Sequence, residues 1–443
     1  MNSDSIIMDE KENWLGVKYV RERYNYERFR SIRQKFVLEN RKKFEDIDFQ
    51  SNSQFVEVVE KMKTILNELN TNQKLRPNTS REAKTLLANL RNLSKQDQRL
   101  FTAILENEVF LIFHRFILEN KQCSLDLKHD TLWNVAIASN FKLSKEKAEY
   151  LASSVLCLTG KLTELHKMDQ VVFLEKMLFA LTNFLLDHSS VGELLQNDKL
   201  LQKHARVLLD EHSSYHISLG LWFIRNLLKI TKNAFEESLA DYSIQNSIFI
   251  ALKNYSDDKD LLFEIIWTLT HVSEIDVQYE ALSPELLMIV MDLTKHNEEF
   301  LLIPILSILG NAFTSLSEQS IKNIIYTSEF SNVLQTSLLS NNFMIKREGL
   351  FLLSNMAAKS GESAGFIIQN ENFVEFLKDI LKKQDPHVYK EALYIVFNLC
   401  YTSSQYYSDS SVKDIFLPLI KSSANSVYID EEIRNLHNQI CNL

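Results

Sequence analysis

A short apolar motif that recurs along the chain is the feature that most constrains its fold. "LWFIRNLL" at residues 221–228 is one of seven similar segments, and each has an anchor residue at the place of Trp222. The seven anchors are Trp133, Phe179, Trp222, Trp267, Ser307, Phe351 and Tyr394. Successive anchors are 46, 43, 45, 40, 44 and 43 residues apart. This regular spacing indicates one structural unit repeated along the chain, not a set of unrelated domains.

The length of the repeat predicts its architecture. A period of about 40 to 47 residues is typical of armadillo or HEAT units, in which two or three helices stack on the next repeat. The segments between anchors contain a second apolar run, such as "NSIFIALKNY" and "FVEFLKDILKK", and degenerate copies extend the array at both ends. We therefore expect an all-α, right-handed superhelical solenoid of about nine or ten armadillo repeats over residues 51–443, with the terminal repeats as caps.

Composition agrees with a helical array. The chain has only 8 Gly and 5 Pro in 443 residues, which favours long helices with short connections over a sheet-rich fold. The start, "MNSDSIIMDEKENW", is acidic where a signal peptide is basic. The sequence contains no run of 18 apolar residues, so we predict no membrane-spanning helix. We expect a protein of the cytoplasm and nucleus that does not bind a membrane.

No motif points to catalysis, a metal or a cofactor. The sequence contains no glycine-rich phosphate loop, no G-x-S-x-G and no H-E-x-x-H. The four cysteines have no C-x-x-C spacing, which predicts neither a zinc site nor a disulfide framework. His212 and His216 are four residues apart with Glu211 adjacent, but without further ligands or a Glu in the zincin position they do not predict a metal site. We therefore expect a protein that is not an enzyme.

A series of amides follows the anchors. Four residues after them stand, in order, Ile137, Asn183, Asn226, His271, Asn311, Asn355 and Asn398. The chain has 35 Asn in 443 residues, so chance would place fewer than one Asn in these seven positions. Two interpretations are open. The aromatics can be core residues with each Asn satisfying a backbone group near a helix end, or the two residue types can line one continuous surface of the solenoid.

The second interpretation predicts a specific ligand. A primary amide can pair with both the N–H and the C=O of an extended peptide, whatever its sequence. Parallel aromatic faces accept the stem and cation of Lys or Arg, and carboxylates select positive charge. Glu264, Glu348 and Glu391 each stand three residues before an anchor, and Asp187 stands four after Asn183. The pattern predicts a groove for an extended basic peptide.

These residues resemble the importin alpha family of armadillo-repeat nuclear import adaptors. "IKREGLFLLSN" and "YKEALYIVFN" are similar to the seventh and eighth repeats of that family, "PILSILGNAFTS" to the sixth and "LTNFLLD" to the third. The resemblance covers about residues 50 to 435. It implies that the groove binds nuclear localisation signals of cargo proteins at a major and a minor site.

The resemblance also implies which residues form each site. The major site would consist of Trp133, Phe179, Asn183, Asp187, Trp222, Asn226, Glu264 and Trp267. The minor site would consist of Asn311, Glu348, Phe351, Asn355, Glu391, Tyr394 and Asn398. The chain departs from the family pattern by lacking the amide at Ile137, by its smaller rings at 179, 351 and 394, and by Lys176 and Lys229, which add positive charge near the major site.

The first 50 residues differ in charge from the rest. Residues 18–43 contain ten basic and three acidic side chains, whereas residues 51–443 contain 38 basic and 48 acidic ones. The segment resembles the family's arm, which binds importin beta and folds back into the groove when unoccupied. That arm would use Arg28, Arg30, Arg33, Lys35, Arg41, Lys42 and Lys43. A solvated basic helix or a nucleic-acid patch is the alternative, but the acidic body would repel phosphates.

Two functions remain open at this stage. The first is a nuclear import adaptor with importin beta, cargo proteins and a nuclear export receptor as partners, and with no affinity for nucleic acid. The second is an armadillo scaffold without a transport role, which binds an extended segment of another partner on the same surface. The basic arm favours the first, because a scaffold has no need of an importin-beta ligand.

Overall fold

The computed structural model describes residues 52–72, 76–196, 198–230, 243–275, 282–296, 299–385, 388–406, 411–423 and 431–442. All regular elements in these ranges are helices. The chain divides into two compact units, residues 1–204 and 205–443, which we call unit 1 and unit 2. The basic arm at residues 1–50 lies outside the described residues, as do Arg28 to Lys43.

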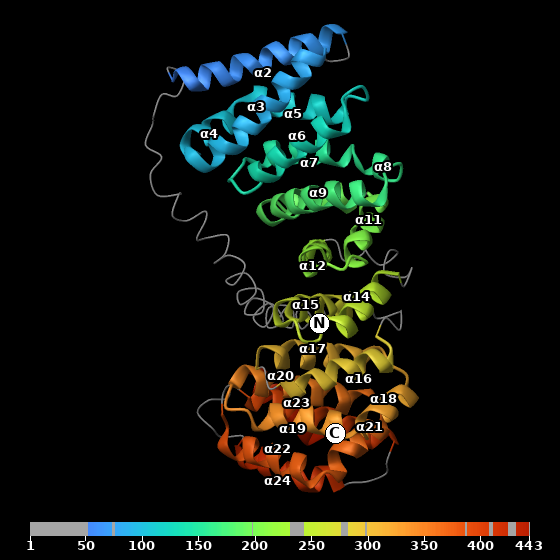
Figure 1. The fold of residues 1–443 in the computed structure, drawn as a ribbon. Coiled ribbons are helices and arrows are strands. Elements are labelled where there is room, and N and C mark those ends of the chain that lie inside the picture. The colour runs from blue at the N-terminus through green and yellow to red at the C-terminus, as the bar shows by residue number, and fades with distance from the viewer. Residues whose placement is uncertain are drawn as a thin grey trace. The chain divides into compact units, whose positions relative to one another are not determined.

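The described residues of unit 1 up to Gln196 form eight helices longer than one turn and one short helix, drawn in blue to green in Figure 1. They are α2 (Ser53–Asn72), α3 (Pro77–Gln96), α4 (Gln98–Glu106), α5 (Glu108–Glu119), α6 (Leu125–Ala138), α7 (Lys145–Leu156), α8 (Thr159–Leu162), α9 (Lys167–Asp187) and α10 (Ser190–Gln196). The boundary between the units falls within α11 (Lys199–Leu209).

Unit 2 continues with helices of the same kind (Figure 1). They are α12 (Ser214–Ile230), α14 (Ser243–Asn254), α15 (Lys259–Ile275), α16 (Pro284–Asp292), η2 (Leu293–His296), α17 (Glu299–Ser315), α18 (Glu318–Ile325), α19 (Ser328–Leu339), α20 (Phe343–Lys359), α21 (Gly361–Gln369), α22 (Glu371–Lys383), α23 (Tyr389–Tyr406), α24 (Ser411–Ser423) and α25 (Glu431–Asn442).

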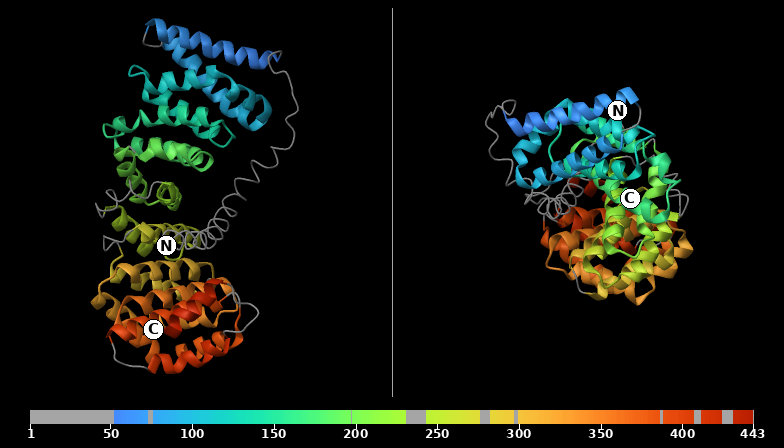
Figure 2. Two further views of the ribbon diagram at one scale, coloured as in Figure 1. Left: turned by 180° about the vertical axis from the view of Figure 1, so that it is seen from behind. Right: turned by 45° about the horizontal axis from the view of Figure 1, so that its top comes forward.

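Each anchor residue lies on an equivalent helix, which confirms the repeat inferred from the sequence. The anchor helices are α6, α9, α12, α15, α17, α20 and α23. In unit 1, α3 packs on α6 and α6 on α9; in unit 2, packing runs from α12 through α15, α17, α20 and α23 to α25. Figure 2 shows this stacking from behind. The second apolar runs of the repeats form α14 and α22, as expected.

Serine side chains cap the first turns of several helices. Ser124, Ser144, Ser283 and Ser317 each accept a hydrogen bond from a backbone N–H in the first turn of the helix that follows. Such caps satisfy N–H groups that the helix itself cannot. The chain can therefore make short connections between helices with few glycines.

Gly310 and Gly349 permit close approach between neighbouring helices. A Cβ on Gly349 of α20 would come within 2.3 Å of Ser337 Oγ on α19, and a Cβ on Gly310 of α17 would come within 3.3 Å of the Phe351 ring on α20. Side chains at these positions would push neighbouring helices apart. The two glycines thus set the packing of α17, α19 and α20, which positions the last anchors.

Apolar side chains of the anchor helices and of the helices between them form the core of each unit. Phe223, Phe263, Phe313 and Phe416 are fully buried within unit 2, and Phe101, Phe110 and Phe113 within unit 1. Within the part of the chain that the structure describes, no helix has the length and hydropathy needed to cross a bilayer.

Candidate functional site

The structure distributes the sequence-predicted site residues unequally between the two units. All residues of the predicted minor site lie in unit 2 on α17, α20 and α23, which pack in succession. The predicted major site is divided. Trp133, Phe179, Asn183 and Asp187 belong to unit 1, and Trp222, Asn226, Glu264 and Trp267 belong to unit 2. The predicted minor site is therefore the set of side chains that one compact unit holds together.

The amides of the unit 2 site connect each anchor helix to the preceding one. Their Nδ2 atoms donate hydrogen bonds to acceptors 38 to 45 residues earlier in the chain. The pairs are Asn311 to Ser273 Oγ (2.9 Å), Asn355 to Gly310 O (2.8 Å), and Asn398 to Ser354 O and Oγ (3.1 Å each). Each bond joins neighbouring repeats, so the amides help to fix the spacing between anchor helices.

Unit 1 contains bonds of the same kind. Asn183 Nδ2 donates to Ser139 Oγ over 3.1 Å, and Asn183 is only 2% exposed. Asn134 directly follows the anchor Trp133, and its Nδ2 donates a hydrogen bond to Leu87 O over 3.2 Å. Asn226 is 4% exposed and bonds within its own helix, to Trp222 O at 2.7 Å. The buried amides of the predicted major site thus have structural roles.

Sequence reasoning allowed the Asn residues to satisfy backbone groups but did not identify these acceptors. A signal was present. Ser139 and Ser273 each stand six residues after an anchor, and each accepts a hydrogen bond from the Asn that stands four residues after the next anchor. A serine at that spacing is the partner that would have indicated a bond between repeats.

The anchor aromatics differ strongly in exposure. Trp133 is 41% exposed, whereas Trp267 is 3% exposed and packs its ring 6.0 Å from that of Phe263. Phe351 and Tyr394 are half-buried. A ligand side chain can stack only on a ring with an accessible face, so Trp133, Phe351 and Tyr394 are accessible anchors and Trp267 is part of the core.

The three predicted glutamates are already engaged within the chain. Glu264 is 4% exposed, and its Oε2 lies 2.9 Å from Nη1 of Arg225, which is 3% exposed. Glu348 is 3% exposed and accepts from Ser307 Oγ at 2.9 Å. Glu391 accepts from Arg347 Nε at 2.8 Å and is half-buried. Asp187, at the end of α9, is exposed.

Two cations of the chain lie near the exposed ring of Trp133. The Arg91 guanidinium carbon is 4.9 Å from the ring centroid, and Lys176 Nζ is 5.2 Å from it. Both distances are within the range of a cation–π interaction. His129 is the third neighbour, with its ring centroid 6.1 Å from that of Trp133, and its pKa is lowered, chiefly by burial.

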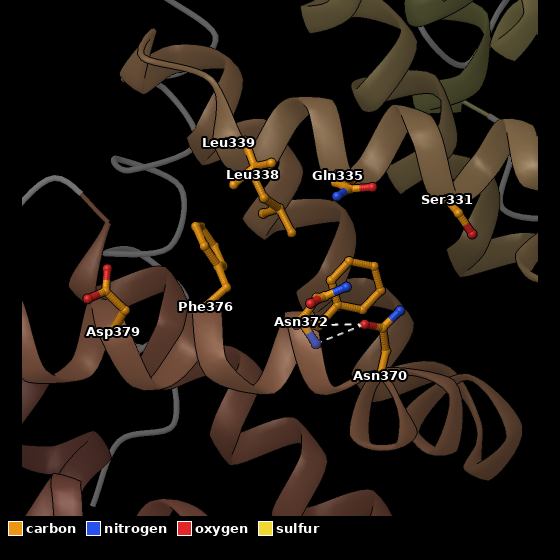
Figure 3. Close-up of a pocket in the computed structure, with 9 residues that line it drawn as sticks. Ser331, Gln335, Leu338, Leu339, Asn370, Asn372, Phe376 and Asp379 are labelled. Carbon is orange, nitrogen blue, oxygen red and sulfur yellow. Dashed lines mark hydrogen bonds between the residues drawn. The ribbon is translucent and has the colours of Figure 1, made fainter.

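A shallow pocket of about 350 Å³ lies elsewhere in unit 2, between α19 and α22 (Figure 3). Leu338 and Leu339 of α19 face Phe376 of α22 across it, and Asn370 uses its side chain to cap α22 by accepting from the Asn372 N–H. No sequence-predicted site residue lines this pocket.

No metal or disulfide chemistry is evident in the described residues. There, no three His, Cys, Asp or Glu side chains are grouped as metal ligands require. Cys123, Cys157, Cys400 and Cys441 are free thiols. Burial raises the pKa of Cys400 to about 11, which keeps it a neutral thiol.

Comparisons with known proteins support the fold. No family model and no curated protein matches the chain. An engineered protein of the Northeast Structural Genomics Consortium, known from its crystal structure, aligns with a TM-score of 0.58 and 14% identity over 90% of this chain and 96% of its own. Two designed armadillo repeat proteins align over 54% of this chain and 97% of their own, with TM-scores of 0.45 and 0.46 and identities of 13% and 14%. The second of these was solved in complex with the peptide (KR)4.

The similarity to the engineered protein and the packing of the anchor helices point to the same fold class. The match that covers most of both chains and the succession of stacked helices show an all-α fold of stacked helical repeats. The expected fold class is therefore confirmed.

Proposed function

We propose that this armadillo scaffold binds an extended basic segment on α17, α20 and α23 of unit 2. The observation that carries the proposal is the pair of half-buried aromatic–amide positions, Phe351 with Asn355 and Tyr394 with Asn398, on helices that pack directly together. Aromatic faces at successive repeats accept the stems of Lys or Arg side chains, and amides bind peptide backbone.

Asn355 has hydrogen-bonding capacity for such a ligand. Its one bond among the described residues uses a single N–H, toward Gly310 O. The second N–H and the carbonyl oxygen can pair with the C=O and N–H of an extended peptide. The surplus of acidic over basic side chains in residues 51–443 attracts a basic segment over long range.

The finer proposal is a nuclear import adaptor of the cytoplasm and nucleus. Its support is the resemblance of the repeats and of the basic segment within residues 1–50 to the importin alpha family. On this proposal the arm at 1–50 binds importin beta, residues 51–443 form the solenoid, and the ligands are nuclear localisation signals of cargo proteins. A nuclear export receptor would be the remaining partner.

The alternative is a scaffold that uses the same surface for a different extended partner. It is favoured by one observation in the structure: Asn183 and Asn226, which the family would use to bind signal backbone, are buried and bonded within the chain. A pull-down with importin beta, using the full chain and the chain without residues 1–50, separates the two proposals. An adaptor binds only with the arm present, and a scaffold binds in neither case.

A titration tests the ligand class directly. The probe is an alternating Lys-Arg octapeptide with a fluorescent label, followed by anisotropy with the full chain. Replacing Phe351 and Tyr394 together by Leu removes both aromatic faces and leaves the amide bonds between repeats intact. We expect the Kd to rise about tenfold or more.

A matched variant controls for general effects of losing an aromatic ring. Phe366 of α21 packs its ring against Tyr326 and Phe330, which lie outside the anchor helices. Phe366→Leu should leave the Kd within about twofold of the original value. Equal affinity in the double variant, or an equal loss in Phe366→Leu, would contradict the proposed site.

A further inference from the structure

The exposed indole of Trp133 in unit 1 is already in contact with positive charge. Arg91 of α3 and Lys176 of α9 place their charged groups 4.9 and 5.2 Å from the ring centroid. Arg91 and Lys176 thus come from two helices, α3 and α9, that both pack on α6. The ring on which a ligand cation would stack therefore already has two cations of the chain beside it.

Lys176 also reverses the charge found at the equivalent position of other repeats. It stands three residues before the anchor Phe179, where Glu264, Glu348 and Glu391 precede their anchors. A carboxylate there would favour a basic ligand side chain, whereas an ammonium group repels one. The reversal occurs in the repeat whose lysine reaches the most exposed anchor tryptophan.

Both cations are held in place. Lys176 Nζ lies 2.5 Å from Glu175 Oε1, and Arg91 Nη1 lies 3.1 Å from Asp130 Oδ1. Only 20% of the Lys176 side chain and 17% of the Arg91 side chain are exposed. A ligand cation would have to displace a paired, largely buried group or add a third positive charge beside the ring.

We propose that Lys176, with Arg91, closes the Trp133 ring to basic side chains, so that an extended basic segment is bound by the anchor residues of unit 2 and not by Trp133. The inference rests on the proposed function for the nature of the ligand. It makes Lys176 a specificity-determining residue of unit 1, beside the Trp133 ring that the family resemblance assigns to the major site.

The test is a double-mutant cycle on the full chain with the labelled Lys-Arg octapeptide. Trp133→Ala alone should change the Kd by less than about twofold. Lys176→Glu should lower the Kd about tenfold by freeing the ring and adding a carboxylate. Trp133→Ala in the Lys176→Glu background should then remove that gain. Lys176→Met serves as a second variant without added negative charge, and should show a smaller gain with the same dependence on Trp133.

Lys253→Glu is the matched control for net charge. Lys253 also lies over an aromatic ring, 4.1 Å from the Phe249 centroid, but on α14, which is not an anchor helix. The same charge reversal there should leave the Kd within about twofold. A gain in Lys253→Glu equal to that in Lys176→Glu would overturn the inference, because the effect would then be one of net charge.

The remaining outcomes separate the inference from the proposed function. A Kd raised fivefold or more by Trp133→Ala in the unmodified chain overturns the inference, because the ring would then bind the basic peptide despite Lys176. Binding by Lys176→Glu without binding by the unmodified chain supports the inference and refutes the proposed function. Absence of binding in both refutes the two together.

Discussion

The side-chain amide of Asn355 on α20 donates a 2.8 Å hydrogen bond to the backbone carbonyl of Gly310 on α17, 45 residues earlier. Gly310 is buried, and a Cβ at that residue would lie 3.6 Å from the amide nitrogen and 3.3 Å from the Phe351 ring. The absence of a side chain at 310 thus leaves room for the Phe351 ring, whereas a Cβ would meet the amide only at ordinary van der Waals distance.

Loss of this amide should weaken the contact between repeats. Asn355→Asp keeps the size of the side chain but replaces the N–H donor with an oxygen that faces the Gly310 carbonyl. We expect unfolding in urea, followed by circular dichroism, to show a loss of about 1 to 3 kcal/mol. Asn323→Asp on the exposed surface of α18 is the control and should change stability by less than about 0.5 kcal/mol. Equal losses in the two variants would show that the bond contributes nothing specific.

Gly349 should not tolerate even a methyl group. A Cβ there would lie 2.3 Å from Ser337 Oγ and 3.0 Å from Ser337 Cβ, so Gly349→Ala forces α19 and α20 apart, at a cost of about 1 to 3 kcal/mol. Ser337→Gly removes the obstacle and should restore part of the loss when the two changes are combined. The melting temperatures of the four proteins in this cycle measure the coupling, and purely additive effects would contradict a steric clash.

The buried pair of Arg225 and Glu264 should respond differently to single and double changes. Glu264→Ala leaves the Arg225 charge in a site where it is 3% exposed, and we expect a loss of about 3 kcal/mol or more. Replacing Arg225 by Met and Glu264 by Leu together removes both charges and should cost less than the single change. Denaturant midpoints of the three proteins decide the matter, and a double variant less stable than Glu264→Ala would show that the pair itself is strongly stabilising.

His114 should make unit 1 sensitive to acid. Burial lowers its pKa to about 4, while Phe110 O accepts a hydrogen bond from its Nδ1 at 2.7 Å. The unfolded chain, with a histidine pKa near 6.5, binds a proton that the folded chain does not. The stability contribution is therefore present above about pH 6.5 and is lost as the pH falls below it, by about 2 kcal/mol at pH 5.

The comparison that isolates this effect uses His114→Leu. All other ionisable groups are common to the two proteins, so the difference in unfolding free energy between pH 7 and pH 5 should be smaller in the variant by about 2 kcal/mol. Identical pH dependence in the two proteins would rule out His114 as the source.

The repeat and its helices could be predicted from the sequence because spacing is a local property. The anchors at 133, 179, 222, 267, 307, 351 and 394 all lie on equivalent helices, and the terminal runs form α2, α3, α24 and α25. The 40-residue spacing between Trp267 and Ser307 did not disturb the register, since α15 packs on α17.

The exposure and the bonding partner of each site residue could not be predicted in the same way, because both depend on side chains of the neighbouring repeat. Trp133 and Trp267 occupy equivalent positions, yet one is 41% and the other 3% exposed. Glu264 and Glu391 are equivalent too, but Glu264 is buried with Arg225, whereas Glu391 is half-buried with Arg347. The two arginines that pair with these glutamates are far from them in the sequence and stand at different distances from their anchors.

The unequal burial of Trp133 and Trp267 also provides the molecule with optical labels of its own. A hydrated indole emits at longer wavelengths than a buried one, and these two indoles belong to different compact units. With Trp14 and Trp222 replaced by Phe, the long-wavelength edge of the emission would follow unit 1 and the short-wavelength edge unit 2. Unfolding of each unit could then be followed separately in one sample, without any added dye.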